Sequence, residues 1–501
     1  MNQPNFSLLK NLSAFLLLVF IISCKDSLTT GNNDVTFTSD AQVTAAVDSV
    51  YLGLAKFGNI NGIFDAQEVS TDELMVPQRG VDWYDADQHV HAQTHKFVAT
   101  DPYLNFSWVS CYAPIAKCNI VINHLPAYSA TQAATLIPEI RAVRAYYYFQ
   151  ILDLFGNAPL FLNDPATTDE YISKDRATIY AFVESELKSV IGKLSKNKTY
   201  GKMNYWTAQA LLARLYLNAE VYTGKANYAG AAAAANDVIT NSPYKLEPDY
   251  FANFIAANEN SNENIWVIPY DGITVTGFNV PFNTLDRGDT EQYNLHQQPW
   301  NGYCAIQDYY NSYDKSDKRL KNFIVGQQYT TPTGTKKIDV NYTPEVDELY
   351  PMTRHDAGAR IGKFEIKFVN GTGESPNDFP LFRLAEMYLI RGEAAWRQNP
   401  GDANALSDIN VSVKRAGLTP LISLSADAIL AERGRELFVE MLHRQDLIRF
   451  GKYSIARRYA QSTDGDKGAK PADDDAIKRS VYPIPQPQID ANKVLRQNTG
   501  Y

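Results

Sequence analysis

The stretch "IRAVRAYYYFQILDLFGNAPL", residues 140–160, decides the fold class of this chain. It belongs to an amphipathic run, Ala130–Phe155, whose periodicity predicts one long helix. Gly156 follows at the position where helices commonly end in a left-handed residue, and Pro159 prevents the helix from continuing. The protein is therefore expected to be built mainly from helices with well-defined ends.

Helical periodicity extends in both directions from this stretch. Residues 104–240 consist of successive amphipathic segments, and the chain returns to predicted helix at Leu384–Gln398, Ala403–Arg415 and Ala426–Arg449. The unit "WTAQALLARLYL" (206–217), followed by a second helix after Tyr228, is similar to a tetratricopeptide helical hairpin, with a generic hairpin as the alternative. In either case four residues should be buried between helices: Trp206, Leu211, Leu215 and Tyr216.

Two segments lack this periodicity. Residues 58–103 are mixed and loop-like, and residues 242–380 are crowded with Gly, Pro, Asn and aromatic side chains. The second segment is too long for a plain connection between helices, so it is expected to carry functional loops.

The N-terminus carries an apolar run that is too short to cross a membrane. Residues 14–22 form a run of about nine apolar residues, whereas a spanning helix needs roughly 20. Lys10 precedes the run, so residues 1–23 are predicted to be a secretory signal. Ser23-Cys24 resembles the cleavage box of bacterial lipoproteins, which implies acylation of Cys24 and a lipidated tether over 24–38. The alternative is an ordinary signal followed by an accidental cysteine.

Charge and cysteine content exclude some classes of function. Lys and Arg total 47 against 56 Asp and Glu, and no basic block stands out, so phosphate-neutralising binding to nucleic acid is excluded. Cys111 and Cys118 lie seven apart on one predicted helix, which places their Cα atoms about 10.5 Å apart. A disulfide needs about 7 Å or less, so both are expected to be free and packed as small hydrophobes.

One acidic constellation has a residue type that can carry out hydrolysis. Glu432, Glu436 and Glu440 share a helix face, and paired carboxylates can cleave glycosidic bonds. The arginines around them favour structural ion pairs instead. Because no phosphate-binding loop, Ser-His-Asp order or HExxH motif accompanies them, the chain is not expected to be an enzyme.

Two clusters have residue types that bind metals. His89, His91 and His95 crowd one short segment, and on a strand the first two would share a face and could hold Zn²⁺ together with Asp85 or Asp87. An exposed polar loop is the favoured interpretation. The acidic stretch 462–475 could hold Ca²⁺, although a solvated loop is favoured there too. No cofactor is therefore predicted.

Five motifs in order give the chain its family resemblance. They resemble those of the SusD/RagB family of outer-membrane nutrient-binding lipoproteins, with Gly392, Met441 and Thr499 departing from the family's usual residues. The motifs are "IRAVRAYYYFQILDLFGNAPL" (140–160), "FRLAEMYLIRGEAAWR" (382–397), "INVSVKRAGL" (409–418), "ERGRELFVEMLHRQDLIRFG" (432–451) and "YPIPQPQIDANKVLRQNTGY" (482–501).

The resemblance implies a mainly α fold in which a tetratricopeptide-like helical scaffold carries a large loop-rich lobe. Residues 39–501 are then one domain, divided into a scaffold, a lobe and an extended C-terminal segment, 461–501. The scaffold is expected at about 39–57, 104–241 and 381–460. The lobe is expected at about 58–103 and 242–380.

The resemblance also implies a function at the cell surface. The protein would be lipid-anchored in the outer membrane, facing the exterior, and would bind a glycan or oligosaccharide. It would deliver this nutrient to a SusC-like TonB-dependent β-barrel transporter. A surface-anchored glycan hydrolase and a peptide-binding protein are the alternatives.

Sugars have apolar C–H faces and hydroxyl rims, so their sites combine aromatic platforms with planar hydrogen-bonding groups. Two loop segments, which the resemblance also places at the ligand, offer this combination. The alternative is that Trp83 and Trp300 fill the lobe's own core. The first segment, residues 78–87, contributes Arg79, Trp83 and Tyr84, with Asp82 beside them. The second, residues 286–303, contributes Asp286, Arg287, Tyr293, Trp300, Asn301 and Tyr303.

Overall fold

The computed structural model describes residues 36–501 and confirms a mainly helical architecture. The predicted signal peptide, Cys24 and most of the tether lie outside the described residues. The longer helices are α2 (Asp40–Leu52), α5 (Pro102–Tyr128), α6 (Ala130–Leu154), α7 (Arg176–Val190), α8 (Tyr205–Leu217), α10 (Tyr228–Asn241), α13 (Leu384–Gln398), α14 (Ala403–Arg415) and α15 (Ala426–Leu437). The shorter ones are α3 (Ile63–Glu68), α4 (Gln88–Thr94), α9 (Ala219–Thr223), α11 (Val280–Thr284), α12 (Gln307–Asn311), α16 (His443–Arg449), α17 (Ala476–Arg479) and α18 (Gln486–Ala491).

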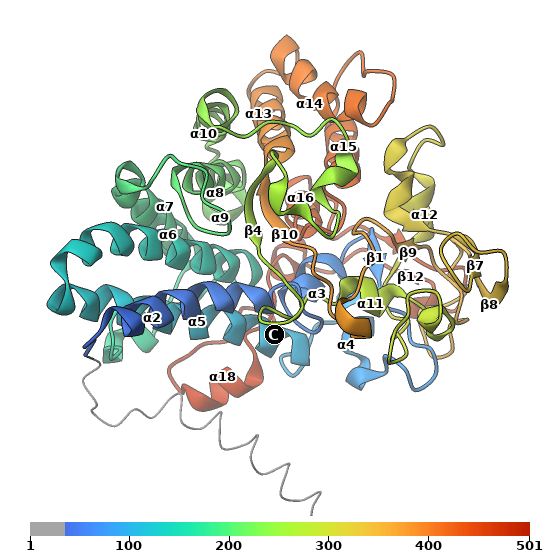
Figure 1. The fold of residues 1–501 in the computed structure, drawn as a ribbon, viewed down its shortest axis with the longest axis horizontal. Helices are drawn as coiled ribbons and strands as arrows, with labels where there is room; N and C mark the ends of the chain where they lie inside the picture. Colours follow the sequence, from blue (N-terminus) through green and yellow to red (C-terminus); the bar gives the residue numbers. More distant parts are fainter. Residues whose placement is uncertain (1–35) are drawn as a thin grey trace, which may run out of the picture.

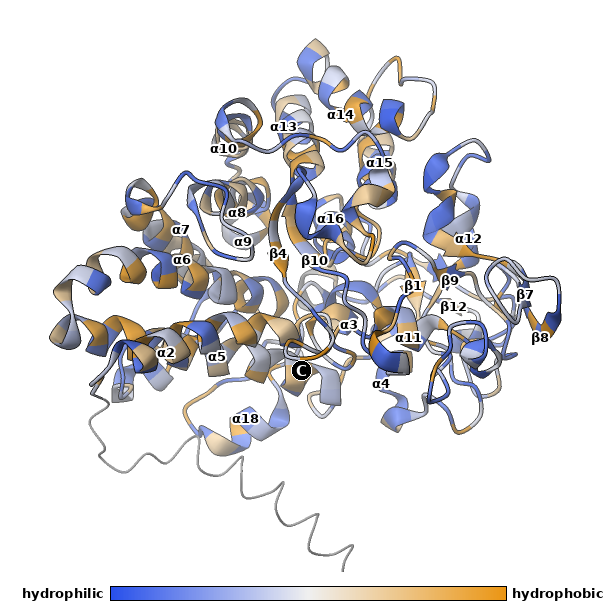
Figure 2. Cartoon of the chain, in the orientation of Figure 1, coloured by the Kyte–Doolittle hydropathy of each residue, from blue (hydrophilic) through white to orange (hydrophobic). Residues whose placement is uncertain are grey.

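The long helices form a scaffold in which each helix packs on its neighbours. α5 packs on α6, α6 on α7, α8 on α10, α10 on α13, and α13 on α14, so the scaffold sweeps around one side of the molecule (Figure 1). Hydrophobic residues run along α2, α5 and α6, where these helices contact one another (Figure 2). Within residues 36–501, none of the helices combines the length and the apolar character needed to cross a bilayer.

The end of α6 follows the sequence prediction. Ser129 accepts a hydrogen bond from the Gln132 amide at the helix N-terminus. Phe155 caps the C-terminus, and Gly156 has φ +69°, a left-handed conformation that glycine adopts without steric cost. Cys111 and Cys118 are buried and free, as predicted, although Pro114 lies inside α5 without ending it.

The predicted core of α8 is confirmed: Trp206, Leu211, Leu215 and Tyr216 are all buried. We expect Leu211→Ala to lower the free energy of unfolding by roughly 2–5 kcal/mol, because it removes buried methyl groups and leaves a cavity. Chemical denaturation with a constant m-value measures this change. Leu52→Ala, at a half-exposed position of α2, is the control and should cost less than about 0.5 kcal/mol. An equally small cost at Leu211 would contradict the assignment of this face to the core.

Short antiparallel strands pair at several places in the lobe and outside it. β4 (Asn264–Ile268) pairs antiparallel with β10 (Phe379–Arg383), and this ladder brings the two ends of residues 269–378 together just before α13. The other ladders join β1 (Leu74–Met75) to β5 (Cys304–Ala305), β2 (Ala158–Pro159) to β3 (Ser173–Lys174), β6 (Phe323–Ile324) to β9 (Arg360–Ile361), β7 (Gly326–Tyr329) to β8 (Lys337–Tyr342), and β11 (Arg457–Arg458) to β12 (Ala469–Lys470).

Two predictions of loop or extended chain are wrong in part. Residues 58–103 contain α3 and α4, and every residue of α3 is buried, so it has no polar face that periodicity could reveal. The C-terminal segment predicted as extended contains α17 and α18. Pro487 lies in the first turn of α18, where the missing N–H of proline has no helical partner to lose.

The predicted helix Ala426–Arg449 is also wrong, because it breaks between α15 and α16. Val439 and Met441 have φ of +51° and +60°, which side chains other than glycine rarely adopt. Their amides donate to the buried carboxylates of Glu73 (3.0 Å from the Val439 nitrogen) and Glu68. The break therefore exchanges helical hydrogen bonds for bonds to the last residue of α3 and to the buried segment that follows it.

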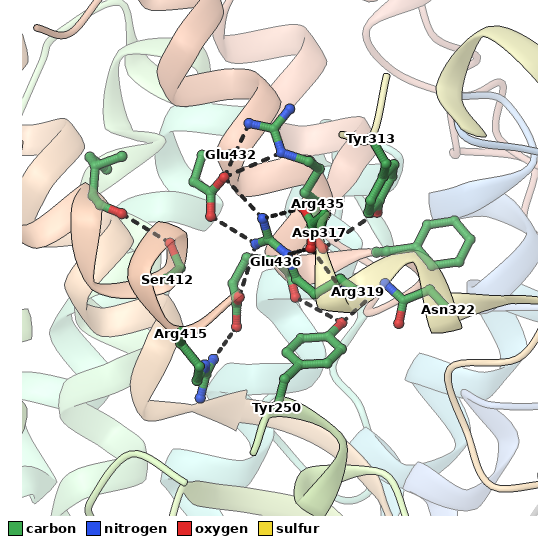
Figure 3. A network of polar contacts seen from close by, with 12 residues as sticks. Tyr250, Tyr313, Asp317, Arg319, Asn322, Ser412, Arg415, Glu432, Arg435 and Glu436 are labelled. Atoms are coloured by element: carbon green, nitrogen blue, oxygen red, sulfur yellow. Dashed lines mark hydrogen bonds and ion pairs between the residues drawn. The ribbon is translucent and has the colours of Figure 1, made fainter. Parts of the chain in front are cut away.

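A buried ion network joins the lobe to the scaffold (Figure 3). Arg319, from the 3₁₀ turn η8 (Lys318–Asn322), contacts Glu432 at 2.7 Å, Asp317 at 2.9 Å and Glu436 at 3.2 Å. Arg415 of α14 also contacts Glu436. The predicted structural role of Glu432 and Glu436 is thus confirmed, but most of their partners come from other elements instead of their own helix. The prediction that Glu440 shares their helix face is wrong, because α15 ends at Leu437; Glu440 pairs with Lys363 and Arg383 instead.

Candidate functional site

The two loop segments singled out in the sequence meet in space. The Arg79 side chain donates to the backbone carbonyls of Asn301 (2.9 Å) and Ala357 (3.0 Å). Burial and the charge of nearby Arg360 lower the pKa of Arg79 to about 9. Arg79 therefore holds the first loop against the second. Its guanidinium donates to backbone carbonyl oxygens of the protein.

The first loop has an unusual backbone. Trp83, Asp85, Ala86 and Asp87 all have positive φ, between +37° and +62°. Such conformations cost of order 1–3 kcal/mol each for residues other than glycine and cluster where a ligand is held. A stretch of this kind motivates the hypothesis that residues 83–87 are shaped for binding.

A surface cavity of about 540 Å³ opens between the two loops. Its lining residues are Ile60, Asn61, Val81, Asp82, Trp83, Asp85, Arg287, Gln298, Pro299 and Trp300. Arg287 and Asp82 form an ion pair across the two loops, with both side chains partly exposed. The cavity therefore presents aromatic surface beside fixed hydrogen-bonding groups.

The two tryptophans have different roles. Trp83 is only 7% exposed, and its indole nitrogen donates to the Trp300 carbonyl at 2.5 Å. Gly302 packs so closely on the Trp83 ring that an added Cβ would lie 2.3 Å from it. For Trp83 the core interpretation holds. The Trp300 ring stands at 64° to that of Trp83. Because Trp300 is 47% exposed, part of its indole ring is open to solvent.

Three predicted residues lie behind the cavity wall and are buried: Asp286, Asn301 and Tyr303. Asn301 is buried, and its side chain donates to Asp286 at 2.8 Å and accepts from Arg360 at 2.7 Å. Tyr303 is fully buried and donates to Asp65. These side chains position the loop that carries Trp300.

Two predicted aromatic residues lie outside the cavity lining. Tyr84 is 57% exposed and follows Trp83, and Tyr293 packs edge-on against Phe368 with ring centres 6.3 Å apart. Arg287 and Trp300 are thus the predicted residues that both line the cavity and reach solvent.

Sequence analysis did not identify several of the residues that line this cavity. Gln298 and Pro299 directly precede Trp300, so the position of this aromatic residue was a usable signal. Ile60 and Asn61 come from the turn before α3, and nothing in their local sequence marks them. Asn61 is fixed by Gln88, whose side chain donates to it at 2.8 Å.

The three clustered histidines do not form an exposed loop, so that interpretation is wrong. They lie on α4 or at its C-terminus, where His89 and His95 are buried. Each ring contacts a different carboxylate: His89 with Asp65 (3.2 Å), His91 with Asp101 (2.7 Å) and His95 with Asp473 (2.7 Å). The helix places His89 and His91 on different faces, and His95 follows the end of α4 with a left-handed backbone. Among residues 36–501, no group of three or more such side chains has metal-binding geometry.

The acidic stretch 462–475 has cationic neighbours of its own. Asp464 pairs with Lys467 at 2.9 Å, and Asp473 pairs with Lys470 at 2.8 Å. Asp466 pairs with Lys96 of the first loop region. These carboxylates already have counter-charges, and none of their contacts brings them to a common centre.

A helical-repeat scaffold that supports an open cavity with an exposed indole defines a ligand-binding protein. Two family models match the chain: the "SusD family" over residues 262–501, and "Starch-binding associating with outer membrane" over residues 30–217. Together they span both the scaffold and the lobe. The chain belongs to the SusD/RagB family.

Known proteins resemble it over most of its length. The starch-binding protein SusD of Bacteroides thetaiotaomicron is 28% identical over 431 residues, which cover 77% of this chain and 76% of that protein. A SusD superfamily protein from Parabacteroides distasonis has the same fold, with a TM-score of 0.75, 21% identity and coverage of 93% and 100%. Surface glycan-binding protein A of Bacteroides thetaiotaomicron, solved with laminarihexaose, gives a TM-score of 0.73 at 20% identity, with coverage of 92% and 100%.

Proposed function

We propose that this protein binds a glycan in the cavity between residues 81–85 and 287–300 and delivers it to an outer-membrane transporter. The observation that carries the proposal is Trp300, a half-exposed indole beside the Arg287–Asp82 ion pair. An indole face accepts the C–H face of a sugar ring, while the carboxylate and guanidinium bond to hydroxyl groups. The relatives whose names mention starch or laminarihexaose support this ligand class.

We expect Trp300→Ala to weaken glycan binding about tenfold or more. An aromatic contact contributes about 0.5–1.5 kcal/mol beyond its buried area, and about 1.4 kcal/mol corresponds to one decade in affinity. Isothermal titration calorimetry with maltohexaose and laminarihexaose on both proteins measures the loss. Tyr171→Ala is the matched control, because it removes an exposed ring that does not line the cavity. Unchanged affinity in Trp300→Ala would contradict the assignment of the site.

Prolonged incubation with the same oligosaccharides separates binding from hydrolysis, the alternative function. Asp82 and Asp85 line the cavity, but Asp82 is paired with Arg287, as expected for a residue that orients a ligand. A binding protein leaves the oligosaccharide intact after prolonged incubation at saturating protein. Release of new reducing ends, lost in Asp82→Asn, would favour a hydrolase.

The localisation is proposed from the sequence resemblance. Cys24 is the lipidation site in this proposal, with the lipid anchor in the outer membrane and the cavity outside the cell. We expect Cys24→Ala to move the protein from the membrane pellet to the soluble or uncleaved fraction, as followed by fractionation and metabolic labelling with a palmitate analogue. Cys304→Ala is the control, since that thiol is buried. Membrane retention of Cys24→Ala equal to that of the unmodified sequence would contradict lipid anchoring.

The transporter is a SusC-like TonB-dependent β-barrel in this proposal. Its support is the family membership and the outer-membrane association in the name of the second family model. Co-purification of a large β-barrel protein with the lipidated chain from detergent-solubilised outer membranes tests it. Recovery of the chain alone under conditions that keep it folded would count against the partnership.

A further inference from the structure

The cavity between residues 81–85 and 287–300 carries an unbalanced negative charge. Among the described residues that line it, Asp82 and Asp85 are the carboxylates and Arg287 is the cation. Arg287 pairs with Asp82, so the described lining holds no second cation for Asp85. Two carboxylates and one guanidinium give the lining a formal charge of −1. A ligand that enters this cavity therefore meets a net negative surface.

The Asp85 carboxylate is exposed and unpartnered. In the described part of the chain it makes no hydrogen bond or ion pair. Loop aspartates elsewhere in this protein accept from backbone amides: Asp271 accepts from Ile273 at 2.8 Å, and Asp286 accepts from Gly288 at 2.7 Å. Aspartate commonly bonds to its own backbone two residues on, which is one reason that turns favour it. Asp85 departs from this pattern, so its two oxygens stay available to a ligand.

The backbone holds Asp85 in place. Asp85, Ala86 and Asp87 have φ of +37°, +52° and +62°, conformations that cost free energy in residues other than glycine. Two bonds of Asp87 fix the turn: its amide donates to the Tyr84 carbonyl, and its side chain accepts from Gln78, both at 2.7 Å. Strained turns persist where their surroundings hold them, and they are common where ligands are clamped. This turn therefore fixes an unpartnered carboxylate beside an open cavity.

Charged groups behind the lining do not reverse its sign. Arg79 and Arg360 are buried there, and the buried carboxylates of Asp286 and Asp289 oppose them. Burial raises the pKa of Asp289 to about 6, which leaves this carboxylate charged at neutral pH and above. Two carboxylates thus balance the two guanidiniums, and the charge of Asp85 is not compensated from behind.

This charge favours one class of sugar over another. A carboxylate only accepts hydrogen bonds, and two adjacent hydroxyl groups of a neutral sugar ring can donate to its two oxygens. A uronic acid or a sulfated sugar brings a second anion, which the Asp85 carboxylate repels. Such an anion reaches Arg287 only in competition with Asp82, which already pairs with it.

We propose that Asp85 restricts this cavity to neutral glycans and excludes glycans that carry carboxylate or sulfate groups. The Asp85 carboxylate accepts hydrogen bonds from hydroxyl groups of a sugar whose C–H face lies on Trp300. This inference rests on the proposed glycan-binding function and names its ligand class.

Two sets of matched oligosaccharides test the role of charge. Each set holds a neutral hexasaccharide, laminarihexaose or maltohexaose, the same chain oxidised at every C6 to the hexauronate, and its hexauronamide. The uronamide has nearly the shape of the uronate but no charge. In calorimetric titrations at slightly alkaline pH and about 0.1 M NaCl, the wild-type protein should bind the uronate at least about tenfold more weakly than the uronamide, a difference of about 1.4 kcal/mol. A uronamide that binds as weakly as the uronate would show that shape excludes both, and would overturn the proposal.

Asp85→Asn removes the charge and keeps the shape of the side chain. The ratio of the uronate and uronamide dissociation constants should fall below about threefold, because the uronate no longer meets a carboxylate. The neutral hexasaccharide should bind about two- to fivefold more weakly, since a carboxylate is a stronger acceptor than an amide. Asp169→Asn, at an exposed position outside the cavity lining, is the matched control and should leave every constant unchanged. A ratio that is the same in Asp85→Asn as in wild type overturns the role of Asp85.

Salt provides a second, independent readout. Raising NaCl from about 0.1 M to about 1 M shortens the Debye length from about 10 Å to about 3 Å. The wild-type ratio of the two dissociation constants should then fall about threefold or more, whereas the ratio of Asp85→Asn should hardly change. A wild-type ratio that does not respond to salt would mean that the exclusion is steric, and would overturn the charge mechanism.

The failure of this inference and the failure of the proposed function give different results. If the neutral hexasaccharides bind and Trp300→Ala weakens them, but the uronates bind equally well, the proposed function stands and the role of Asp85 is wrong. If none of the oligosaccharides binds, or if Trp300→Ala binds them as wild type does, the proposed site is wrong and the ligand class falls with it.

Discussion

Arg319→Met is expected to lower the free energy of unfolding by about 3–5 kcal/mol. The guanidinium is 1% exposed and contacts three carboxylates, those of Asp317, Glu432 and Glu436 (Figure 3). The substitution leaves buried Asp317 without its ion-pair partner, while Glu432 keeps Arg435 and Glu436 keeps Arg383 and Arg415. Removing one partner of a buried ion pair typically costs this amount. Because Arg319 belongs to the lobe and Glu432 to α15, the variant should also loosen the lobe, as hydrogen exchange of residues 313–324 would report.

The control for Arg319→Met is an exposed ion pair. Lys188 contacts Glu184 one helical turn away on α7, and its side chain is largely in solvent. Lys188→Met should therefore cost less than about 1 kcal/mol when wild type and both variants are unfolded in urea. A cost below 1 kcal/mol for Arg319→Met would show that the network is not needed for stability.

The stability difference between wild type and Arg319→Met should depend on pH because of Glu436. Burial alone would raise its pKa, but Arg415, Arg383 and Arg319 together lower it from 4.5 to about 2. A lowered pKa stabilises the folded state above the unfolded value of 4.5, and that contribution is lost as pH falls toward 2. The stability gap between wild type and Arg319→Met should therefore be widest above about pH 5 and should narrow as the solution is acidified.

Trp83→Ala is expected to destabilise the protein by about 3–5 kcal/mol, the usual cost of emptying a tryptophan site in a core. The ring packs against Gly302 and lies beside Tyr303 and His89, with ring centres 5.9 and 5.5 Å away. Glycan affinity should fall as well, because the Trp83 indole bonds to the backbone of Trp300. Thermal unfolding followed by circular dichroism measures the first effect, and calorimetric titration measures the second.

Trp83→Phe and Trp300→Ala separate packing from binding. The first keeps most of the buried aromatic volume and should recover a large part of the lost stability. The second should cost clearly less stability than Trp83→Ala, because nearly half of the Trp300 side chain is already in water. If Trp83→Ala has the melting temperature of wild type, burial of the Trp83 ring does not stabilise the fold. The assignment of Trp83 to the core and Trp300 to the binding surface is then wrong.

The sequence predicted the scaffold well because its helices are amphipathic and have local end signals. The helix over 130–154 ends at Gly156 as expected, and the face with Leu211 and Leu215 is buried. Each of these features depends on residues within a few turns of one another. The loop segments around Trp83 and Trp300 were also identified, because aromatic residues crowded among Gly, Pro and Asn mark loops with a binding role.

Elements whose stability comes from distant partners could not be predicted. α3 is buried on all sides, so its polar residues, such as Asp65, are satisfied by partners far along the chain, including Tyr303. The break between α15 and α16 depends on Glu68 and Glu73, which accept hydrogen bonds from the amides of Met441 and Val439. Each acceptor lies more than 360 residues before its donor in the sequence. No local pattern encodes such bonds, because their free energy exists only once the chain is folded.

The sequence by itself thus determined the helical scaffold, the family and the pair of loops that meet at the cavity. Tertiary structure alone decided which aromatic residue in those loops faces solvent. Trp83 and Trp300 have the same side chain and similar polar neighbours, but only Trp83 lies against a glycine backbone that closes over its ring. Exposure is a property of packing between residues more than 200 positions apart, and local sequence carries no record of that packing.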